Sequence, residues 1–316
     1  MRTAIVYSKC HVLHHDSDHP ENARRVESIL KKIDDEDLIL IKSPGREASR
    51  QELELVHEED FIDFVFGLDS LEKKDTIYAT GMLTKDNYFS DDTPKAAIAS
   101  AGCVLSAVDL MMSGKADNAF ALCRPPGHHA EASGAMGFCF FNNIAVGARY
   151  AYEKYDLKKI FILDLDAHHG NGTQHIFERR DEVFYCSIHQ YPLFPGTGRD
   201  LEIGYGNGVG LTLNIPLPPG SGEDDYMRVM SEKVIPSIES FMPDMILVSA
   251  GFDTHRLDPL TDMMLKTASY GKITRLLKDT AKRFCSGRLL YVLEGGYDLY
   301  ALADSAVCVL RELQKE

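Results

Sequence analysis

The chain has 316 residues, of which 44% are hydrophobic, and this is enough to build a large core in one domain or two. Its formal net charge is -14, with 48 acidic residues against 34 basic ones. A surface this acidic argues against nucleic acid and anionic membranes as partners and favours cationic ligands, although the charge also serves solubility alone.

The cysteines indicate the cellular compartment in which the protein works. Seven of them are scattered through the chain without a C-x-x-C pair, which predicts free thiols in a reducing environment. The first apolar run is too short for a signal sequence, and no stretch is expected to approach the length of a membrane span. We therefore expect a cytoplasmic protein. The sequence does not indicate an oligomeric state.

The N-terminal segment begins with a short strand over residues 4–7, followed by a His-rich stretch over 11–19. The irregular spacing of that stretch favours a polar loop over a metal cluster. An amphipathic helix is predicted over 23–33, with Asn22 as its cap. Arg25 is most simply an exposed or salt-bridged residue of this helix.

Two further helical regions precede the centre of the chain. One or two short helices are predicted over 52–66, where His57 reads as a structural histidine. An apolar helix over 96–112 should pack against a sheet, because Ala, Val and Leu occupy it all round. Asp92 and Pro94 form a typical start for it, a capping residue followed by proline.

Strands and helices alternate through the rest of the chain without a linker or an internal repeat. Helices are predicted over 144–155, 173–179, 223–241, 269–284 and 298–313. Strands are predicted over 119–123, 183–188, 210–215, 245–250 and 289–293, in addition to the apolar run that starts at 161. This alternation predicts a single α/β domain over 1–316, with a mainly parallel central sheet and helices on both faces.

The stretch F-I-L-D-L-D-A-H-H-G-N-G at 161–172 carries the strongest chemical signal. Side chains two apart in a strand share a face, so Asp166 and His168 converge if strand geometry continues to the end of the run. A carboxylate and an imidazole that converge suit a divalent metal of borderline softness. The alternative is a turn and helix cap, because Asp, His and Gly are ordinary turn residues.

Three other predicted strands end in polar residues. His128 and His129 follow 119–123, Asp253 follows 245–250, and Tyr297 follows 289–293. The ends of parallel strands share one edge of the sheet, so Asp253 can complete a three-ligand metal site with one position open for water. A metal can acidify the attacking water, a His pair can move the proton of that water, and a tyrosine can stabilise an oxyanion. These three parts together indicate amide hydrolysis. A structural role for the adjacent histidines is the alternative.

These motifs also carry a family resemblance. The stretches that carry it are RPPGHHA at 124–130, GFCFFNN at 137–143, DLDAHHGNGTQ at 164–174, PGTG at 195–198, SAGFD at 249–253 and EGGY at 294–297. In this order they resemble the zinc-dependent histone deacetylase family, and most of all its class II-like bacterial and archaeal branch with acetylpolyamine amidohydrolases and acetoin-utilisation proteins. The resemblance spans nearly the whole chain and implies the arginase–deacetylase fold.

The resemblance implies roles residue by residue. The metal ligands would be Asp166, His168 and Asp253, and they would hold Zn²⁺ or, with the same donors, Fe²⁺. His129 would be the general base and then the general acid, with Asn171 as its partner. His128 would act electrostatically, oriented by Asp164, and Tyr297 would polarise the acyl carbonyl.

The resemblance also implies a substrate tunnel and a second cation. The tunnel would be walled by Gly137, Phe138, Phe194 and Leu260. Asp92 would hold the substrate at the rim, unless it only caps its helix. A structural K⁺ would be bound by Asp164 and Ser187 and by the backbone carbonyls of Asp166, His168 and Ile188.

The substrate class stays open at this level. An acetylated lysine in a protein and an acetylpolyamine both fit an apolar tunnel in an acidic protein, and an amine with a longer acyl group also remains open. Asn171 stands where the class I branch has Asp, which makes His129 the weaker base of the two possibilities. Leu260 stands where a polyamine-selective animal relative has an acidic residue, which weakens the polyamine assignment.

Two other functions compete with deacetylation. A ureohydrolase of the same fold needs a second carboxylate two residues after His168, where this chain has Gly170. An inactive acyl-lysine binder would be expected to lack Tyr297 or a metal ligand, and none of these is missing.

Overall fold

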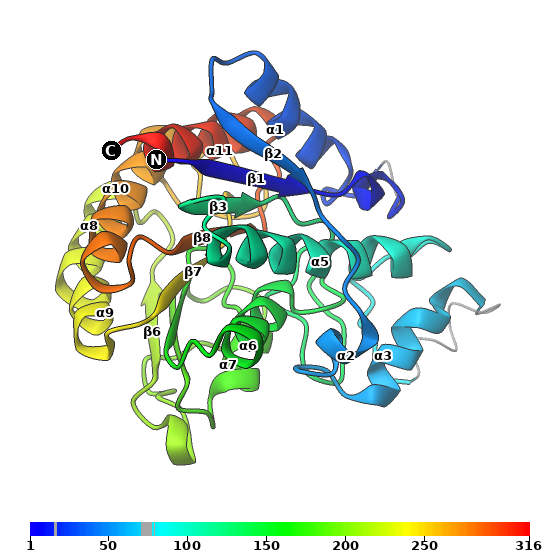
Figure 1. Cartoon of the computed structure of the whole chain (residues 1–316). Coiled ribbons are helices and arrows are strands. Elements are labelled where there is room, and N and C mark those ends of the chain that lie inside the picture. The colour runs from blue at the N-terminus through cyan, green and yellow to red at the C-terminus, as the bar shows by residue number, and fades with distance from the viewer. Residues whose placement is uncertain (16–17, 71–77, 79) are drawn as a thin grey trace.

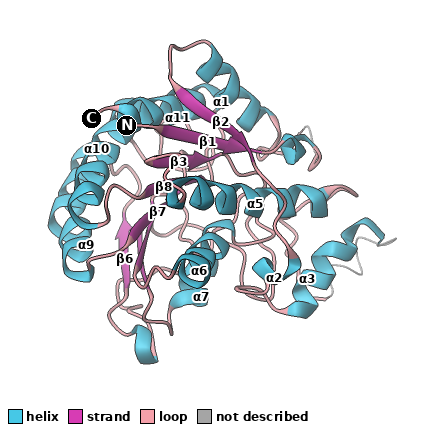
Figure 2. Cartoon of the chain, in the orientation of Figure 1, coloured by secondary structure: helices cyan, strands magenta, loops and turns pink. Residues whose placement is uncertain are grey.

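The computed structural model describes residues 1–15, 18–70, 78 and 80–316. Its centre is a β-sheet with helices around it (Figure 2). The sheet has eight strands in the order β2-β1-β3-β8-β7-β4-β5-β6, and the paired strands run parallel. The strands are β1 (Thr3–Tyr7), β2 (Leu40–Pro44), β3 (Asn118–Ala121), β4 (Ile160–Asp164), β5 (Val183–Gln190), β6 (Thr212–Leu217), β7 (Met245–Ala250) and β8 (Leu289–Leu293). The predicted single α/β domain with a parallel sheet is confirmed.

Helices cover both faces of this sheet (Figure 1). One face carries α2 (Arg50–Leu53), α3 (Glu59–Phe66), α5 (Thr93–Met112), α6 (Asn143–Tyr155) and α7 (Asn171–Phe177). The other carries α1 (Arg24–Asp34), α8 (Glu223–Val229), α9 (Ile235–Phe241), α10 (Thr267–Phe284) and α11 (Leu299–Gln314). The two ends of the chain meet, because the amino group of Met1 donates to the carbonyl of Gln314 at 2.9 Å.

The strands have two buried faces and therefore read as continuous apolar runs. Along β4, Ile160 and Ile162 belong to one hydrophobic core and Phe161 and Leu163 to the other. This is the two-residue alternation of a strand. Asp164 ends the run and is fully buried.

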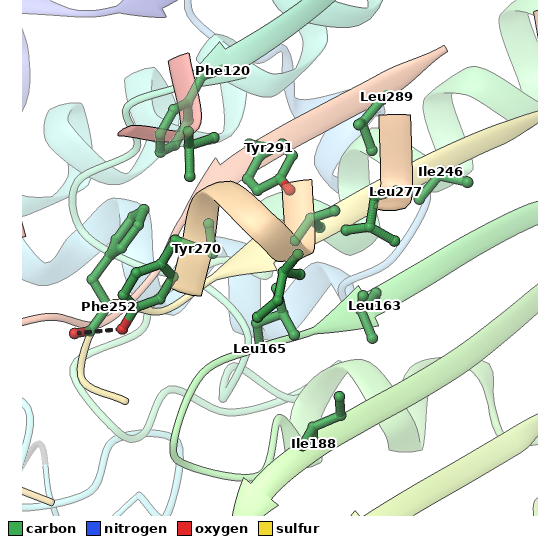
Figure 3. Close-up of a cluster of buried hydrophobic side chains, with 14 of the residues drawn as sticks. Phe120, Leu163, Leu165, Ile188, Ile246, Phe252, Tyr270, Leu277, Leu289 and Tyr291 are labelled. Atoms are coloured by element: carbon green, nitrogen blue, oxygen red, sulfur yellow. Dashed lines mark hydrogen bonds between the residues drawn. The ribbon is translucent and has the colours of Figure 1, made fainter. Parts of the chain in front are cut away.

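Helix α10 packs on the hydrophobic core that contains Phe161 and Leu163 (Figure 3). Leu277 on this helix is fully buried among strand side chains. Tyr270 donates its hydroxyl to the carbonyl of Phe252 at 3.3 Å, and Thr274 lies 2.9 Å from the hydroxyl of Tyr291. The polar atoms at this contact are therefore paired, as burial requires.

Two local features differ from the sequence prediction. Strand β2 at the edge of the sheet was not predicted. The helix predicted over 223–241 is divided by a π-helical turn at Met230–Val234. Pro236 follows this turn and has no backbone N–H to donate, so a regular α-helical hydrogen-bond pattern cannot pass through it.

Helix α5 also corrects an expectation. Its length and apolar composition are those of a membrane-spanning helix, whereas no such stretch was expected. Most of it is buried inside the molecule, where it packs on β1, β3 and α6. Its apolar character is therefore that of a helix inside the core.

The His-rich stretch near the N-terminus is less exposed than predicted. Asp16 and Ser17 lie outside the described residues. His14 is fully buried, with its ring stacked on Tyr88 at 4.1 Å between centroids, and its Nε2 lies 3.7 Å from Glu21. Part of the expected polar loop therefore belongs to the interior.

His57 is a structural histidine, as predicted. Its Nε2 accepts the backbone N–H of Asn142 at the start of α6, and its Nδ1 lies 3.0 Å from the carbonyl oxygen of Glu131. This arrangement requires the neutral ring with hydrogen on Nδ1. Burial lowers the pKa of His57 to about 4.

The native state should therefore lose stability in acid. Above pH 6.5 His57 is neutral in both states, whereas between pH 6.5 and 4 only the unfolded chain takes up the proton, which costs about 2 to 3 kcal/mol of unfolding free energy by pH 4.5. Urea unfolding between pH 7.5 and 4.5 measures this loss. A His57→Gln variant keeps one donor and one acceptor and should show a shallower pH dependence; equal slopes would contradict the assignment.

Candidate active site

The turn after β4 is built from carboxylates that accept backbone N–H groups. Asp164 accepts from Asp166 at 3.1 Å, Asp166 accepts from His168 at 2.9 Å, and Asp253 accepts from Ala167 at 2.9 Å. The strand itself ends at Asp164. Asp166 and His168 converge as predicted. The predicted reason, continued strand geometry, was wrong, because the strand ends before them.

Asp166, His168 and Asp253 form a compact group of metal-ligating atoms. One such atom from each lies within 4.8 Å of the others. Nδ1 of His168 is 3.1 Å from Asp166 Oδ1 and 2.9 Å from Asp253 Oδ2. A Cβ at Gly251 would lie 2.3 Å from Asp166 Oδ2, and one at Gly295 would lie 2.6 Å from it, so only glycine fits beside these carboxylates.

The electrostatics of this group suit a cation. Burial raises the pKa of Asp253 to about 7, and the negative charge of Asp166 adds to the effect. Burial alone would lower the pKa of His168, but its bonds to Asp166 and Asp253 outweigh that effect and raise it to about 10. Two buried carboxylates and an imidazole are the donors that Zn²⁺ or Fe²⁺ takes in proteins, so the residues fit such an ion.

The adjacent histidines have different partners. Nδ1 of His128 lies 3.0 Å from Asp164 Oδ2, and Nδ1 of His129 lies 2.8 Å from Asn171 Oδ1. Burial opposes charge on both rings, but Asp164 and Asp166 raise the pKa of His128 to about 10. Burial and the charge of His128 hold the pKa of His129 well below its usual value. Environments that separate two pKa values in this way favour His129 as the base.

Glu294 fixes the loop that carries this pair and was quoted in a sequence motif without a role. It is fully buried, and its Oε2 accepts the N–H of Gly127 at 2.7 Å and of His128 at 3.1 Å. Burial raises its pKa to about 7. The end of β8 is thereby tied to the loop after β3.

Arg25 is neither exposed nor peripheral. It is fully buried and salt-bridged to Glu21 at 3.2 Å, and its Nε donates to the carbonyl of Gly296 at 2.7 Å. It also donates to the carbonyl of Glu294, and its guanidinium lies over the Tyr297 ring, 5.0 Å from the centroid. The sequence carried one signal for this position. Arg25 lies four residues before Ile29 on a helix, so the two side chains share a helix face.

A second contact positions Tyr297. Its backbone N–H donates to Asp258 Oδ2 at 2.7 Å, and Asp258 Oδ1 accepts the N–H of Leu260 at 3.0 Å. One buried carboxylate therefore links the tyrosine to the Leu260 loop. The sequence carried no signal for Asp258.

A pocket of about 260 Å³ reaches the metal-ligating group at His168. Its lining residues are Asp86, His129, Gly137, Phe138, His168, Leu193, Phe194, Leu260 and Tyr297. All four predicted wall residues are among them, with Leu193 in addition. A larger groove of about 770 Å³ between β6 and α9 contains none of the site residues.

The carboxylate at the pocket is Asp86, not Asp92. Asp86 Oδ2 accepts the N–H of Gly137 at 2.6 Å. Asp92 stands at the N-cap position of α5, makes no capping hydrogen bond, and pairs with Lys95 at 2.8 Å. The helix-start pattern at Asp92 was strong, whereas no local pattern distinguishes Asp86.

Two buried histidines hold the loop that carries Phe194. Nδ1 of His169 lies 2.8 Å from the hydroxyl of Thr197, and Nε2 of His189 lies 2.9 Å from the carbonyl of Gly198. Gly198 has a φ of +88°, and a Cβ there would lie 2.6 Å from both rings. The glycine of the PGTG motif is therefore required by close packing as well as by backbone conformation.

The residues predicted to bind K⁺ also lie together. Asp164 and Ser187 are register partners on β4 and β5, and Ile188 follows Ser187 on β5. The Ser187 hydroxyl lies 2.9 Å from Nδ1 of His189, and Tyr185 donates to Asp164 Oδ2 at 3.1 Å. Cation binding here stays a prediction.

Comparison with known proteins places the chain in a family. The histone deacetylase domain family matches residues 19–313. The chain belongs to the histone deacetylase family. The resemblance seen in the sequence is thereby confirmed.

Several members of the histone deacetylase family align with nearly the whole chain. "Histone deacetylase 14, chloroplastic" of Arabidopsis thaliana is 38% identical over 99% of this chain and 77% of its own length. A "Probable deacetylase" of Archaeoglobus fulgidus is 38% identical over 95% and 82%. The "Histone deacetylase-like amidohydrolase" of Pseudomonas aeruginosa is 38% identical over 93% and 76%. The crystal structure of the HDA15 HD domain superposes with a TM-score of 0.91, at 35% identity over 99% of this chain and 88% of that one.

Arg25 should be a large contributor to stability. Arg25→Gln leaves Glu21 with less compensation and frees two carbonyl groups, so we expect a loss of about 3 to 5 kcal/mol in unfolding free energy. Urea denaturation measures it. Lys31→Gln, on an exposed position of the same helix, is the control and should change stability by no more than about 0.5 kcal/mol. Equal stability of the two variants would show that the buried contacts of Arg25 contribute little.

Proposed function

We propose that this member of the histone deacetylase family is a metal-dependent amidohydrolase that removes an acetyl group from an acetylated primary amine. The substrate is an acetyl-lysine side chain of a protein or an acetylpolyamine. The observation that carries the proposal is that His129, His168 and Tyr297 line one apolar pocket, which His168 joins to the Asp166–His168–Asp253 group.

Each residue has a part in this chemistry. Asp166, His168 and Asp253 would hold Zn²⁺ or Fe²⁺, which when bound polarises the acyl carbonyl and makes water more acidic. His129 takes the proton from the attacking water and returns it to the departing amine. His128, paired with Asp164, stays protonated and stabilises negative charge. The Tyr297 hydroxyl donates to the developing oxyanion.

The pocket walls suit an alkyl arm. Phe138 and Phe194 present aromatic rings to it, and Leu260 is 39% exposed at the surface. A four- or five-carbon amine arm is apolar along its length, and such walls exclude water from the reacting amide. The net charge of -14 favours a cationic substrate.

The proposal has two further parts. Seven free cysteines support a cytoplasmic location. A K⁺ ion would be bound near Asp164 and Ser187.

Geometry argues against a ureohydrolase site. A Cβ at Gly170 would lie 2.2 Å from Asp164 Oδ2 and 3.0 Å from Nδ1 of His128. A second bridging carboxylate cannot therefore stand two residues after His168 in this backbone. The competing function is that of an inactive protein that binds acyl-lysine without hydrolysing it. A measurement of turnover distinguishes this binder from an enzyme.

Amine release by the zinc-loaded protein tests the proposal. An acetyl-lysine peptide and acetylated putrescine or spermidine are compared side by side, and we expect at least one to turn over. Tyr297→Phe removes only the hydroxyl and should lower kcat by about 10² to 10³ with zinc content unchanged. A zinc-loaded protein that hydrolyses none of these substrates would favour the binder. A tenfold preference for the peptide, about 1.4 kcal/mol in transition-state binding, would assign protein deacetylation.

Metal binding should stabilise the fold. Zn²⁺ at 100 times its Kd adds about 2.7 kcal/mol to the unfolding free energy, so we expect a rise of about 5 °C in Tm. Asp253→Asn removes one of the two carboxylates and should abolish most of this rise. Differential scanning calorimetry with added Zn²⁺, and again with chelator, measures both. A rise that persists in Asp253→Asn would place the metal elsewhere.

A further inference from the structure

The amide of Asn171 lies between His129 and a carboxylate that has no assigned role. Asn171 Oδ1 is 2.8 Å from Nδ1 of His129, and Asn171 Nδ2 donates to Glu131 Oε1. His129 and Asn171 are 4% and 3% exposed, so the contact between them is shielded from water, whereas the Glu131 side chain is 27% exposed.

The neighbours of the amide nitrogen can only accept hydrogen bonds. Besides the Glu131 carboxylate, they are the backbone carbonyl of His129 and the sulfur of Met136, each 3.4 Å from Nδ2. An amide has two distinct ends, and the end with hydrogens must face acceptors. The Asn171 oxygen therefore faces His129. Glu131 is the charged acceptor of this set, and charge-assisted hydrogen bonds are the stronger ones.

The orientation of the amide decides where His129 carries its hydrogen. An oxygen at Nδ1 requires hydrogen on Nδ1, which leaves Nε2 of the neutral ring with a lone pair. A neutral histidine can accept a proton only at the nitrogen that has the lone pair. Since His129 also lines the pocket, its tautomer matters directly to a reaction there.

We propose that Glu131 is a positioning residue that, through the Asn171 amide, holds His129 in the tautomer with hydrogen on Nδ1 and a free lone pair on Nε2. The catalytic consequence rests on the proposed function of His129 as general base. Glu131 itself touches neither the pocket nor the metal-ligating residues in the hydrogen bonds of the described chain.

Glu131 is anchored for this task on both sides of its backbone. Its N–H donates to the carbonyl of Gly134 at 2.8 Å, and its carbonyl lies 3.0 Å from Nδ1 of His57. Its carboxylate also lies 2.9 Å from Nδ1 of His175, one helical turn after Asn171 on α7. The carboxylate therefore bridges two side chains on one face of α7.

Glu131→Gln is the informative change. A glutamine can donate to the Asn171 oxygen, so the Asn171 amide can turn over and present its hydrogens to Nδ1 of His129. We expect ¹⁵N NMR of histidine-labelled, zinc-loaded protein to show hydrogen moving from Nδ1 to Nε2 of His129. We also expect kcat to fall by about 10-fold to 100-fold, the range for outer partners of functional histidines, with KM changed less than about twofold.

A second substitution separates amide orientation from general damage. Asn171→Asp alone would set two carboxylates against each other, so it is combined with Glu131→Gln. In this double variant the glutamine at position 131 can donate to one oxygen of the carboxylate at position 171, while the other oxygen faces His129 whichever way that carboxylate turns. We expect ¹⁵N NMR to show hydrogen back on Nδ1 of His129, and kcat to rise about fivefold or more above that of Glu131→Gln alone. A double variant that keeps the tautomer of Glu131→Gln would overturn the proposal.

Two further variants complete the test. Glu131→Asp keeps an acceptor-only group and should retain the wild-type tautomer, so it still reports on the proposal if Glu131→Gln does not fold. His175→Gln removes the other, solvent-facing partner of Glu131, whose side chain is 44% exposed, and should leave the tautomer and kcat unchanged.

An unchanged His129 tautomer in folded Glu131→Gln overturns the proposal whatever kcat does. The NMR result stands without turnover, so failure of the proposed function would be seen separately, as a wild-type protein that hydrolyses no substrate.

Discussion

Buried negative charge at the carboxyl edge of the sheet is the constraint on which the rest of the site depends. Asp164, Asp166, Asp253 and Glu294 are each no more than 1% exposed. A buried carboxylate is costly unless it is hydrogen-bonded or paired. Here backbone N–H groups of the turns after β3, β4 and β8 supply the hydrogen bonds. The same charge makes a divalent cation a favourable occupant, so the carboxylates that are costly to bury also form the candidate metal site.

Glycine is what allows these turns to approach one another so closely. Side chains at Gly170, Gly251 or Gly295 would collide with the carboxylates of Asp164, Asp166 or Asp253. The motifs DLDAHHG, SAGFD and EGGY therefore combine chemistry and packing in a few residues: the polar residue bears the reactive group, and the glycine makes room for its neighbour. The metal-ligating group forms only where three such turns meet at one edge of a parallel sheet.

A second layer of buried charge holds the tyrosine side of the site. Glu21 pairs with Arg25 and with Arg124, and Arg25 in turn donates to two carbonyl groups of the turn that precedes Tyr297. Attraction to the two arginines outweighs burial and holds the pKa of Glu21 below its ordinary value. Helix α1 therefore takes part in the site at a distance, although none of its residues lines the pocket.

Local sequence pattern predicted most of the secondary structure and the candidate site residues, although it missed β2 and the π-helical turn. Apolar runs that end in polar residues predicted the strands and their active edge, because period and burial are local properties of the chain. The Asp166–His168–Asp253 group, the His128–His129 pair, Tyr297 and the pocket walls were all placed from motifs and the family resemblance. The supporting groups beyond Asp164 and Asn171 follow from tertiary contacts. Asp86 at the pocket, Asp258 behind Tyr297, Glu131 behind Asn171 and the burial of Arg25 depend on contacts between segments far apart in the chain. A charged residue is expected to be solvated until the fold shows what covers it, so local pattern did not identify Asp86, Asp258 or Glu131. For Arg25 the helical spacing to Ile29 was the one local signal.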